Sequence, residues 1–156
     1  MLTIREMTAL DRTVVMPMVT EFYHSSAVEH DVPAAVLERS FDAAAGSDGL
    51  LRGFLLLEGE EAVGYCYVTE YYSAEVGGRC LMIEELYLTP GCRGKGYGSQ
   101  MFGWLMERYP GHLRLRLEVT LANEGAVRLY KRLGFRFLEY GQMVLDREWE
   151  EEKWTR

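Results

Sequence analysis

A glycine-rich loop joins a strand-like run to a helix-like run in the second half of the chain. Residues 93–98 read Arg-Gly-Lys-Gly-Tyr-Gly, after the largely apolar run 81–88 and before a helical pattern over about 97–109. Glycines at such a junction expose backbone N–H groups beside the positive end of a helix dipole, where a phosphate or pyrophosphate binds well. Arg93 and Lys95 add positive charge for the same anion. The loop therefore predicts an anion-binding strand–loop–helix unit, although similar spacing also occurs in flexible loops without a ligand.

The spacing of the glycines excludes two common phosphate loops. A Rossmann fingerprint requires glycine where this chain has Ser99, and a Walker loop requires Ser or Thr where it has Gly96. A Walker loop would also need glycine at the position of Thr89. Another kind of fold must therefore use this loop.

Two motifs resemble those of one enzyme family. Arg93-x-x-Gly96-x-Gly98 is similar to the R/Q-x-x-G-x-G/A signature of the GCN5-related N-acetyltransferases (GNAT). The segment from Asn123 to Phe135 resembles the second motif of that family, N-x-x-A-x-x-L-Y-x-x-x-G-F. The two patterns occur in the expected order and cover about residues 80–140 closely. The resemblance implies an enzyme that uses acetyl-CoA as cosubstrate and needs no metal.

The resemblance also implies which residues hold acetyl-CoA. Loop amides would bind the pyrophosphate, the strand before the loop would bind the pantetheine arm through its main chain, and Asn123 would add a hydrogen bond while capping its helix. The implied cofactor-binding residues are Leu86, Tyr87, Leu88, Arg93, Gly94, Lys95, Gly96, Tyr97, Gly98, Ser99, Asn123 and Ala126.

The hydrophobic pattern predicts a mixed α/β fold in one domain over residues 1–146, followed by a charged tail over 147–156. The resemblance implies a centrally splayed sheet of about seven strands flanked by helices. We expect strands at 2–7, 50–57, 62–72, 81–88, 113–119, 135–140 and 143–145. We expect helices from Thr8 or Asp11 to Phe22, over about 31–46 and 97–109, and from the cap Asn123 to the terminator Gly134.

Composition narrows the class of protein. The 156 residues suit one domain, and they contain no run of 18 apolar residues and no secretory signal pattern, so we expect a cytoplasmic protein without a membrane partner. The net charge of −7 disfavours nucleic acid and favours a small cationic substrate. Cys66, Cys80 and Cys92 lack metal-site or disulfide spacing. A homodimer is an open expectation.

Two adjacent glutamates interrupt the strand before the loop. Acetyl transfer needs a neutral amine, whereas an alkylamine of pKa ~10.4 is almost fully protonated at pH 7, so a general base is useful. Strand alternation predicts that Glu84 and Glu85 point to opposite faces, and at least one should face a cleft because a buried lone carboxylate is costly. The resemblance favours Glu84, nine residues before Arg93, as in relatives with an assigned base. Glu85, a water relay and a purely structural carboxylate remain open.

Tyr130 is the second catalytic candidate. The resemblance aligns it with a tyrosine whose hydroxyl points at the CoA sulfur, where a phenol of pKa ~10 can protonate a leaving thiolate. The alternative is an aromatic core residue on an amphipathic helix.

The acceptor remains open at this level. The segment 21–31 lies where relatives build the acceptor pocket, and its acids and aromatics suit a cationic amine such as a polyamine, an aminoglycoside or an amino-acid derivative. An exposed helix end is the plain alternative. Two further function classes are a protein or peptide N-acetyltransferase and a non-catalytic acyl-CoA sensor.

Overall fold

A five-stranded sheet forms the centre of the computed structural model, which describes residues 1–147. The strands are β1 (Leu2–Glu6), β2 (Leu51–Glu58), β3 (Glu61–Ser73), β4 (Gly78–Leu88) and β5 (Arg114–Leu117), in that spatial order. Neighbours are antiparallel except β4 and β5, which are parallel. The predicted mixed α/β fold is confirmed, with five strands in place of about seven.

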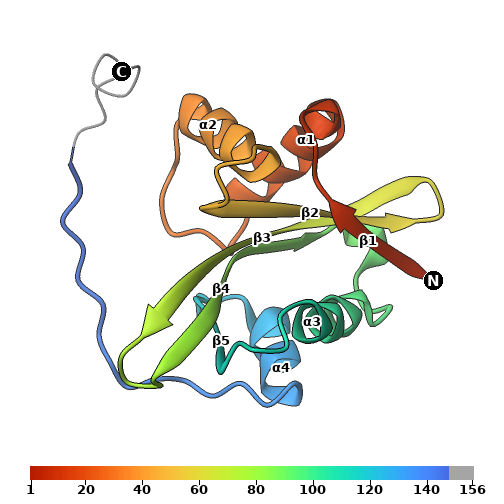
Figure 1. Cartoon of the computed structure of the whole chain (residues 1–156). Helices are drawn as coiled ribbons and strands as arrows, with labels where there is room; N and C mark the ends of the chain where they lie inside the picture. Colours follow the sequence, from red (N-terminus) through yellow and green to blue (C-terminus); the bar gives the residue numbers. More distant parts are fainter. Residues whose placement is uncertain (148–156) are drawn as a thin grey trace.

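Four helices cover the two faces of the sheet (Figure 1). They are α1 (Arg12–Tyr23), α2 (Ala34–Ala45), α3 (Tyr97–Arg108) and α4 (Glu124–Arg132), with short 3-10 turns η1 (Ala9–Asp11) and η2 (Pro90–Cys92). Helices α1 and α2 lie on one face, and α3 and α4 on the other. All four helices were predicted, with ends displaced by a few residues. Within residues 1–147, no helix is both long and apolar enough to cross a membrane.

Alternation along β3 divides the core into two clusters. Tyr65 and Tyr67 pack toward α1 and α2, whereas Cys66 and Val68 pack toward α3. Cys66 and Cys80 are fully buried and free, so they serve as small apolar core residues. Both faces of the middle strands are therefore covered, so any carboxylate on them must be paired or must reach a cavity.

A β-bulge interrupts the alternation of β4. Tyr67 pairs with Glu85 and the next residue, Val68, pairs with Ile83, so Glu84 is left out of the backbone pairing with β3. An extra residue of this kind bends its strand and redirects the side chains beside it. The parallel pairing of β4 with β5 ends just before the bulge, at Ile83 and Leu117. The sheet therefore splays at Glu84, and β5 is shorter than the predicted strand at 113–119.

The last two predicted strands, 135–140 and 143–145, are wrong. No strand follows α4 up to residue 147, and Figure 1 shows this segment running away from the sheet and the helices. Phe135 is anchored, since it packs in the α3-side cluster and its N–H donates to the Tyr130 carbonyl. Alternation is not sufficient for a strand, because a strand also needs an adjacent edge with which to hydrogen-bond. Most of the predicted tail, 148–156, lies outside the described residues.

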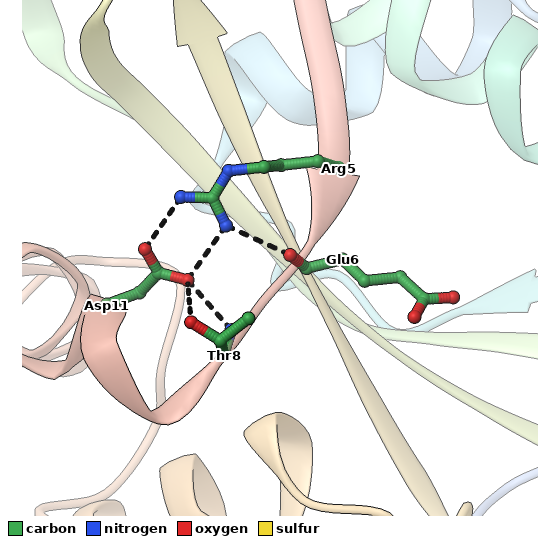
Figure 2. A network of polar contacts seen from close by, with 4 residues as sticks. All are labelled: Arg5, Glu6, Thr8 and Asp11. Carbon is green, nitrogen blue, oxygen red and sulfur yellow. Dashed lines mark hydrogen bonds and ion pairs between the residues drawn. The ribbon is translucent and has the colours of Figure 1, made fainter.

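The entry to α1 is fixed by a charged network (Figure 2). The Arg5 guanidinium makes two hydrogen bonds to the Asp11 carboxylate, at 2.7 and 2.9 Å, and the Thr8 N–H donates to the same carboxylate at 2.8 Å. The hydrogen bonds from Arg5 are the main reason why the pKa of buried Asp11 falls to about 2, although burial opposes this shift. The network ties β1 to the first helical turn.

Candidate active site

The glycine-rich loop has the backbone that the sequence predicts. Gly94 and Gly96 adopt positive φ angles of 78° and 82°, and Gly96 is the N-cap of α3. A Cβ at either position would meet nothing within 4 Å, so the left-handed backbone rather than crowding selects glycine there. The loop is therefore open to solvent beside the positive end of α3, as an anion site requires.

Gly98 serves a different purpose. A Cβ at this buried position would lie 2.7 Å from Leu129 Cδ2 on α4. Glycine therefore lets α3 and α4 approach closely, and this links the loop to the second motif of the chain.

The basic side chains of the loop already have partners. Lys95 Nζ lies 3.3 Å from a Glu58 oxygen, and the Tyr97 hydroxyl donates to the same carboxylate. Arg93 Nε donates to the Leu88 carbonyl at 2.9 Å, and its guanidinium lies over the Tyr87 ring. Arg93 makes no ion pair with any described carboxylate, so its positive charge remains available to an anion at the loop.

A cavity of about 930 Å³ opens where β4 and β5 separate. It is bounded by the end of α1, the bulge of β4, all of β5, one side of α4 and the chain that follows α4. Its lining includes Phe22, Tyr23, Glu84, Glu85, Arg114, Arg116, Val127 and Tyr130. Both predicted catalytic residues, Glu84 and Tyr130, thus border one cavity, and so does part of the segment 21–31.

Glu85 is a buried carboxylate with only hydroxyl partners. Its side chain accepts hydrogen bonds from the Tyr23 and Tyr65 hydroxyls, the latter at 2.6 Å. Burial raises the pKa of Glu85, the two tyrosine hydrogen bonds oppose that shift, and the negative charge of Glu84 adds to it. Within residues 1–147, no cationic side chain forms an ion pair with Glu85. A buried carboxylate without a cation is unfavourable by itself, and this one borders a cavity.

Glu84 is exposed and accepts a hydrogen bond from Thr69 Oγ1 at 2.8 Å. Thr69 lies two residues beyond Tyr67 on a stretch of β3 that has no bulge, so it shares the α1 face with Tyr65 and Tyr67. Since Glu84 reaches Thr69 and Glu85 reaches Tyr65, both carboxylates lie on the same face. The prediction of opposite faces is wrong, because the bulge inserts one residue into the period-two pattern.

Tyr130 lies at the other side of the cavity, on α4. Its ring packs edge-on against Phe102 at 5.7 Å and contacts Phe135 at 5.8 Å between centroids. Burial raises the pKa of Tyr130 to about 12, with a smaller effect of Cys66 in the same direction. The phenol is therefore fully protonated at neutral pH and is a hydrogen-bond donor.

The remaining predicted cofactor residues lie on the end of β4 and on the first turn of α4. Asn123 caps α4, where its Oδ1 accepts from the Ala126 N–H at 3.4 Å. Leu86 and Leu88 pack on the α3 side, whereas Tyr87 packs on the α1 side. Pairing of β4 with β5 stops at Ile83, so the β5-facing edge beyond the bulge has no strand partner among the described residues.

Sequence reasoning missed Tyr65 and Thr69, the β3 residues that hold the two carboxylates. Strand periodicity places both on the face of Tyr67, but only the register of β3 with β4 shows which of them meets which glutamate. Groups of three or more potential metal ligands are absent from the part of the chain that the structure describes.

One family of known proteins matches this chain. The sequence profile described as Acetyltransferase (GNAT) family matches residues 16–135. A streptothricin acetyltransferase of Streptomyces lavendulae is 37% identical over 101 residues, which are 62% of this chain and 50% of that protein. The chain thus spans about half the length of the curated relative that it matches.

Two solved structures share the fold. A possible acetyltransferase of Clostridium difficile 630 has a TM-score of 0.78 at 17% identity, with 94% of this chain and 98% of that chain covered. The aminoglycoside N-acetyltransferase AAC(6')-Iy, in complex with the bisubstrate analog CoA-S-monomethyl-acetylneamine, has a TM-score of 0.75 at 14% identity, with 94% and 99% covered. The profile match extends from α1 through the loop to Phe135, so this chain belongs to the GNAT family of acetyltransferases, which use acetyl-CoA.

Proposed function

We propose that the protein transfers the acetyl group of acetyl-CoA to a primary amine of a small cationic molecule. The observation that carries this proposal is the buried Glu85 carboxylate, which borders the cavity and has hydroxyl donors but no described cation. An ammonium group of the acceptor would supply the missing positive charge. The rings of Phe22 and Tyr23 border the same cavity and suit a cation.

Glu84 is the proposed general base. It is exposed, it lies beside Glu85, and it borders the cavity, so it can take a proton from the reacting ammonium directly or through water. The freed amine nitrogen attacks the thioester carbonyl carbon, and the carbon–sulfur bond breaks to release CoA thiolate. An ammonium held against Glu85 stays protonated and is not the nucleophile, so Glu85 is proposed to bind and Glu84 to deprotonate.

Tyr130 is the proposed general acid. Its hydroxyl keeps its proton at neutral pH, because burial raises the pKa, and can pass it to the thiolate as the carbon–sulfur bond breaks. The proposed cofactor contacts are those of the 93–99 loop, the main chain of residues 86–88, Asn123 and Ala126.

Two features support a small acceptor. A cavity of about 930 Å³ is within the usual size range for small-molecule sites. The relative from Streptomyces lavendulae is named a streptothricin acetyltransferase, and the structural neighbour AAC(6')-Iy is named an aminoglycoside N-acetyltransferase. Arg114 and Arg116 also border the cavity, which favours an amino-acid-like acceptor with a carboxylate as a second candidate.

The test is a screen of amines with acetyl-CoA, with free CoA thiol as the readout, followed by pH profiles for the best acceptor. Glu84→Gln should lower kcat/KM mainly at low and neutral pH, and the deficit should shrink as pH nears ~10, where the amine loses its own proton. Glu85→Gln should instead raise KM for cationic acceptors and leave the shape of the profile unchanged.

Glu118→Gln is the matched control, since Glu118 is an exposed carboxylate that borders the same cavity on the β5 side. It should behave like the unaltered protein. A pH-dependent deficit in Glu85→Gln with none in Glu84→Gln would exchange the two roles. Absence of thiol release with every amine, in protein that binds acetyl-CoA, would favour an acyl-CoA sensor.

A further inference from the structure

A second, smaller pocket of about 400 Å³ lies at the C-terminal end of α3. It is lined by Arg52, Glu70, Arg79, Arg108, Tyr109, Pro110, Gly111 and His112, none of which borders the larger cavity. Helix α3 has 12 residues, so this pocket is about 18 Å along the helix from the loop at its N-terminus. A ligand here would be separate from acetyl-CoA and its acceptor.

Unpartnered polar atoms gather in this pocket. Three atoms are buried and have no hydrogen-bond partner within residues 1–147: Arg52 Nε, the Tyr109 hydroxyl and His112 Nδ1. The His112 side chain is only 7% exposed, and its other ring nitrogen lies 2.8 Å from a Glu70 oxygen. An ionised carboxylate only accepts hydrogen bonds, so His112 Nε2 is the donor to Glu70. This hydrogen bond orients the imidazole ring and leaves Nδ1 without a partner in residues 1–147. Buried polar atoms without partners are rare and costly in proteins.

The charges of the pocket favour an anion. Three guanidinium groups, from Arg52, Arg79 and Arg108, lie in a chain whose net charge is −7. Glu6 partly offsets two of them, at 2.9 Å from Arg108 and 3.8 Å from Arg52, and Glu70 holds His112. Arg79 makes no ion pair with any carboxylate in residues 1–147. When Glu6 and Glu70 are subtracted from the three arginines, one net positive charge remains at the pocket. This charge exceeds the partial negative charge, roughly half a unit, at the C-terminal end of α3.

The donors also fit the chemistry of one kind of anion. Arg52 Nε and the Tyr109 hydroxyl offer protons, and the electrostatic neighbours of Tyr109 include Arg52 and Arg108. His112 Nδ1 accepts a hydrogen bond when the ring is neutral and donates one when the ring is charged, so an oxyanion that carries both oxygens and an O–H group satisfies either form. Hydrogen phosphate carries both acceptor oxygens and such a hydroxyl, and arginine pairs with phosphate through two parallel hydrogen bonds.

We propose that the pocket formed by Arg52, Arg79, Tyr109 and His112 is a binding site for a phosphate-type oxyanion, either free phosphate or the phosphate of a small molecule. Bound there, the anion would connect β2, β4 and the turn after α3. That turn leads directly into β5, and it is held to β4 where the Leu113 N–H donates to the Arg79 carbonyl at 2.8 Å.

The experiment titrates the full chain with inorganic phosphate and, in a parallel arm, with glycerol phosphate. Saturating CoA is present so that the loop at residues 93–99 is occupied. Calorimetry should show one saturable site, and the melting temperature should rise with occupancy. The tighter of the two probes identifies the source of the phosphate.

Two variants test the residues. Arg79→Gln removes an exposed guanidinium without an ion pair and should weaken phosphate binding about tenfold. Tyr109→Phe keeps the ring and should weaken it severalfold, whereas Arg128→Gln, on the surface of α4, should change nothing. Absence of saturable binding, or equal affinity in all three variants, would overturn the proposal. CoA binding in each variant shows that it is folded.

Discussion

At the scale of single residues, Glu84 and Glu85 have different environments although they are of the same type and adjacent in the sequence. Glu85 is 7% exposed and surrounded by tyrosines, whereas Glu84 is exposed and bonded to Thr69. Burial raises the pKa of Glu85 more than its hydrogen bonds lower it. Buried Glu85 therefore suits the proposed binding of an acceptor ammonium better than rapid exchange of protons with water. Exposed Glu84 suits such an exchange.

Tyr130→Phe tests the proposed acid. The change keeps the ring contacts with Phe102 and Phe135 and removes only the hydroxyl. Because general acid catalysis is typically worth 10²–10⁴-fold, kcat should fall by about that range while the affinity for CoA stays the same. Steady-state and single-turnover rates measure the effect. A variant with half the original chemical rate would return Tyr130 to a packing role.

At the scale of elements, the junction of β4, its loop and α3 carries the proposed cofactor site. The loop needs left-handed backbone at Gly94 and Gly96, and α3 needs Gly98 to pack against α4. The bulge at Glu84 lies on β4 before the loop, at the point where the pairing of β4 with β5 ends. The left-handed loop forms the proposed anion site, and the bulge leaves the free strand edge beside the cavity.

Gly96→Asp tests the loop. A negative side chain beside the pyrophosphate should lower CoA affinity at least tenfold, about 1.4 kcal/mol, as measured by calorimetry. Gly96→Ala is the matched control, because it carries the same strain from a φ of 82° but no charge, and its space is open. If both variants bound CoA as tightly as the unaltered protein, the pyrophosphate would have to bind elsewhere.

At the scale of the whole molecule, the ends of the sheet differ in how they are secured. β1 is tied to α1 by Arg5 and Asp11, whereas β5 has four residues and the chain after α4 does not continue the sheet. Phe137, Tyr140 and Met143 are accordingly exposed.

Asp11→Asn tests the first of these links. The folded pKa of Asp11, about 2, lies below the ordinary value of ~3.9, so its stabilising effect is present above pH ~4 and is lost as pH falls toward 2. The variant should be less stable at neutral pH by ~1–2 kcal/mol in urea unfolding, and the difference should vanish near pH 2. Glu124→Gln, which breaks an exposed pair with Arg128, should cost much less at any pH. A gap that does not depend on pH would remove the ion pair as its cause.

The sequence by itself determined the helices, the first five strands, the glycine loop and the family. The helices, strands and loop rest on local chemistry: apolar periodicity, the Asn123 cap, and glycines at positive φ. The family rests on the resemblance of two motifs to those of its members. Local rules also identified both glutamates and Tyr130, because carboxylates in an apolar strand and a motif tyrosine are visible without coordinates.

Only the tertiary structure decided which face each glutamate takes, because a bulge depends on the register between two strands and not on one strand's composition. It also decided that residues 135–145 are not strands, since pairing requires an edge at the right place. The smaller pocket at the C-terminal end of α3 could not be predicted from the sequence either. Its residues Arg52, Arg79 and His112 come from distant parts of the chain and meet only after the sheet and α3 pack together.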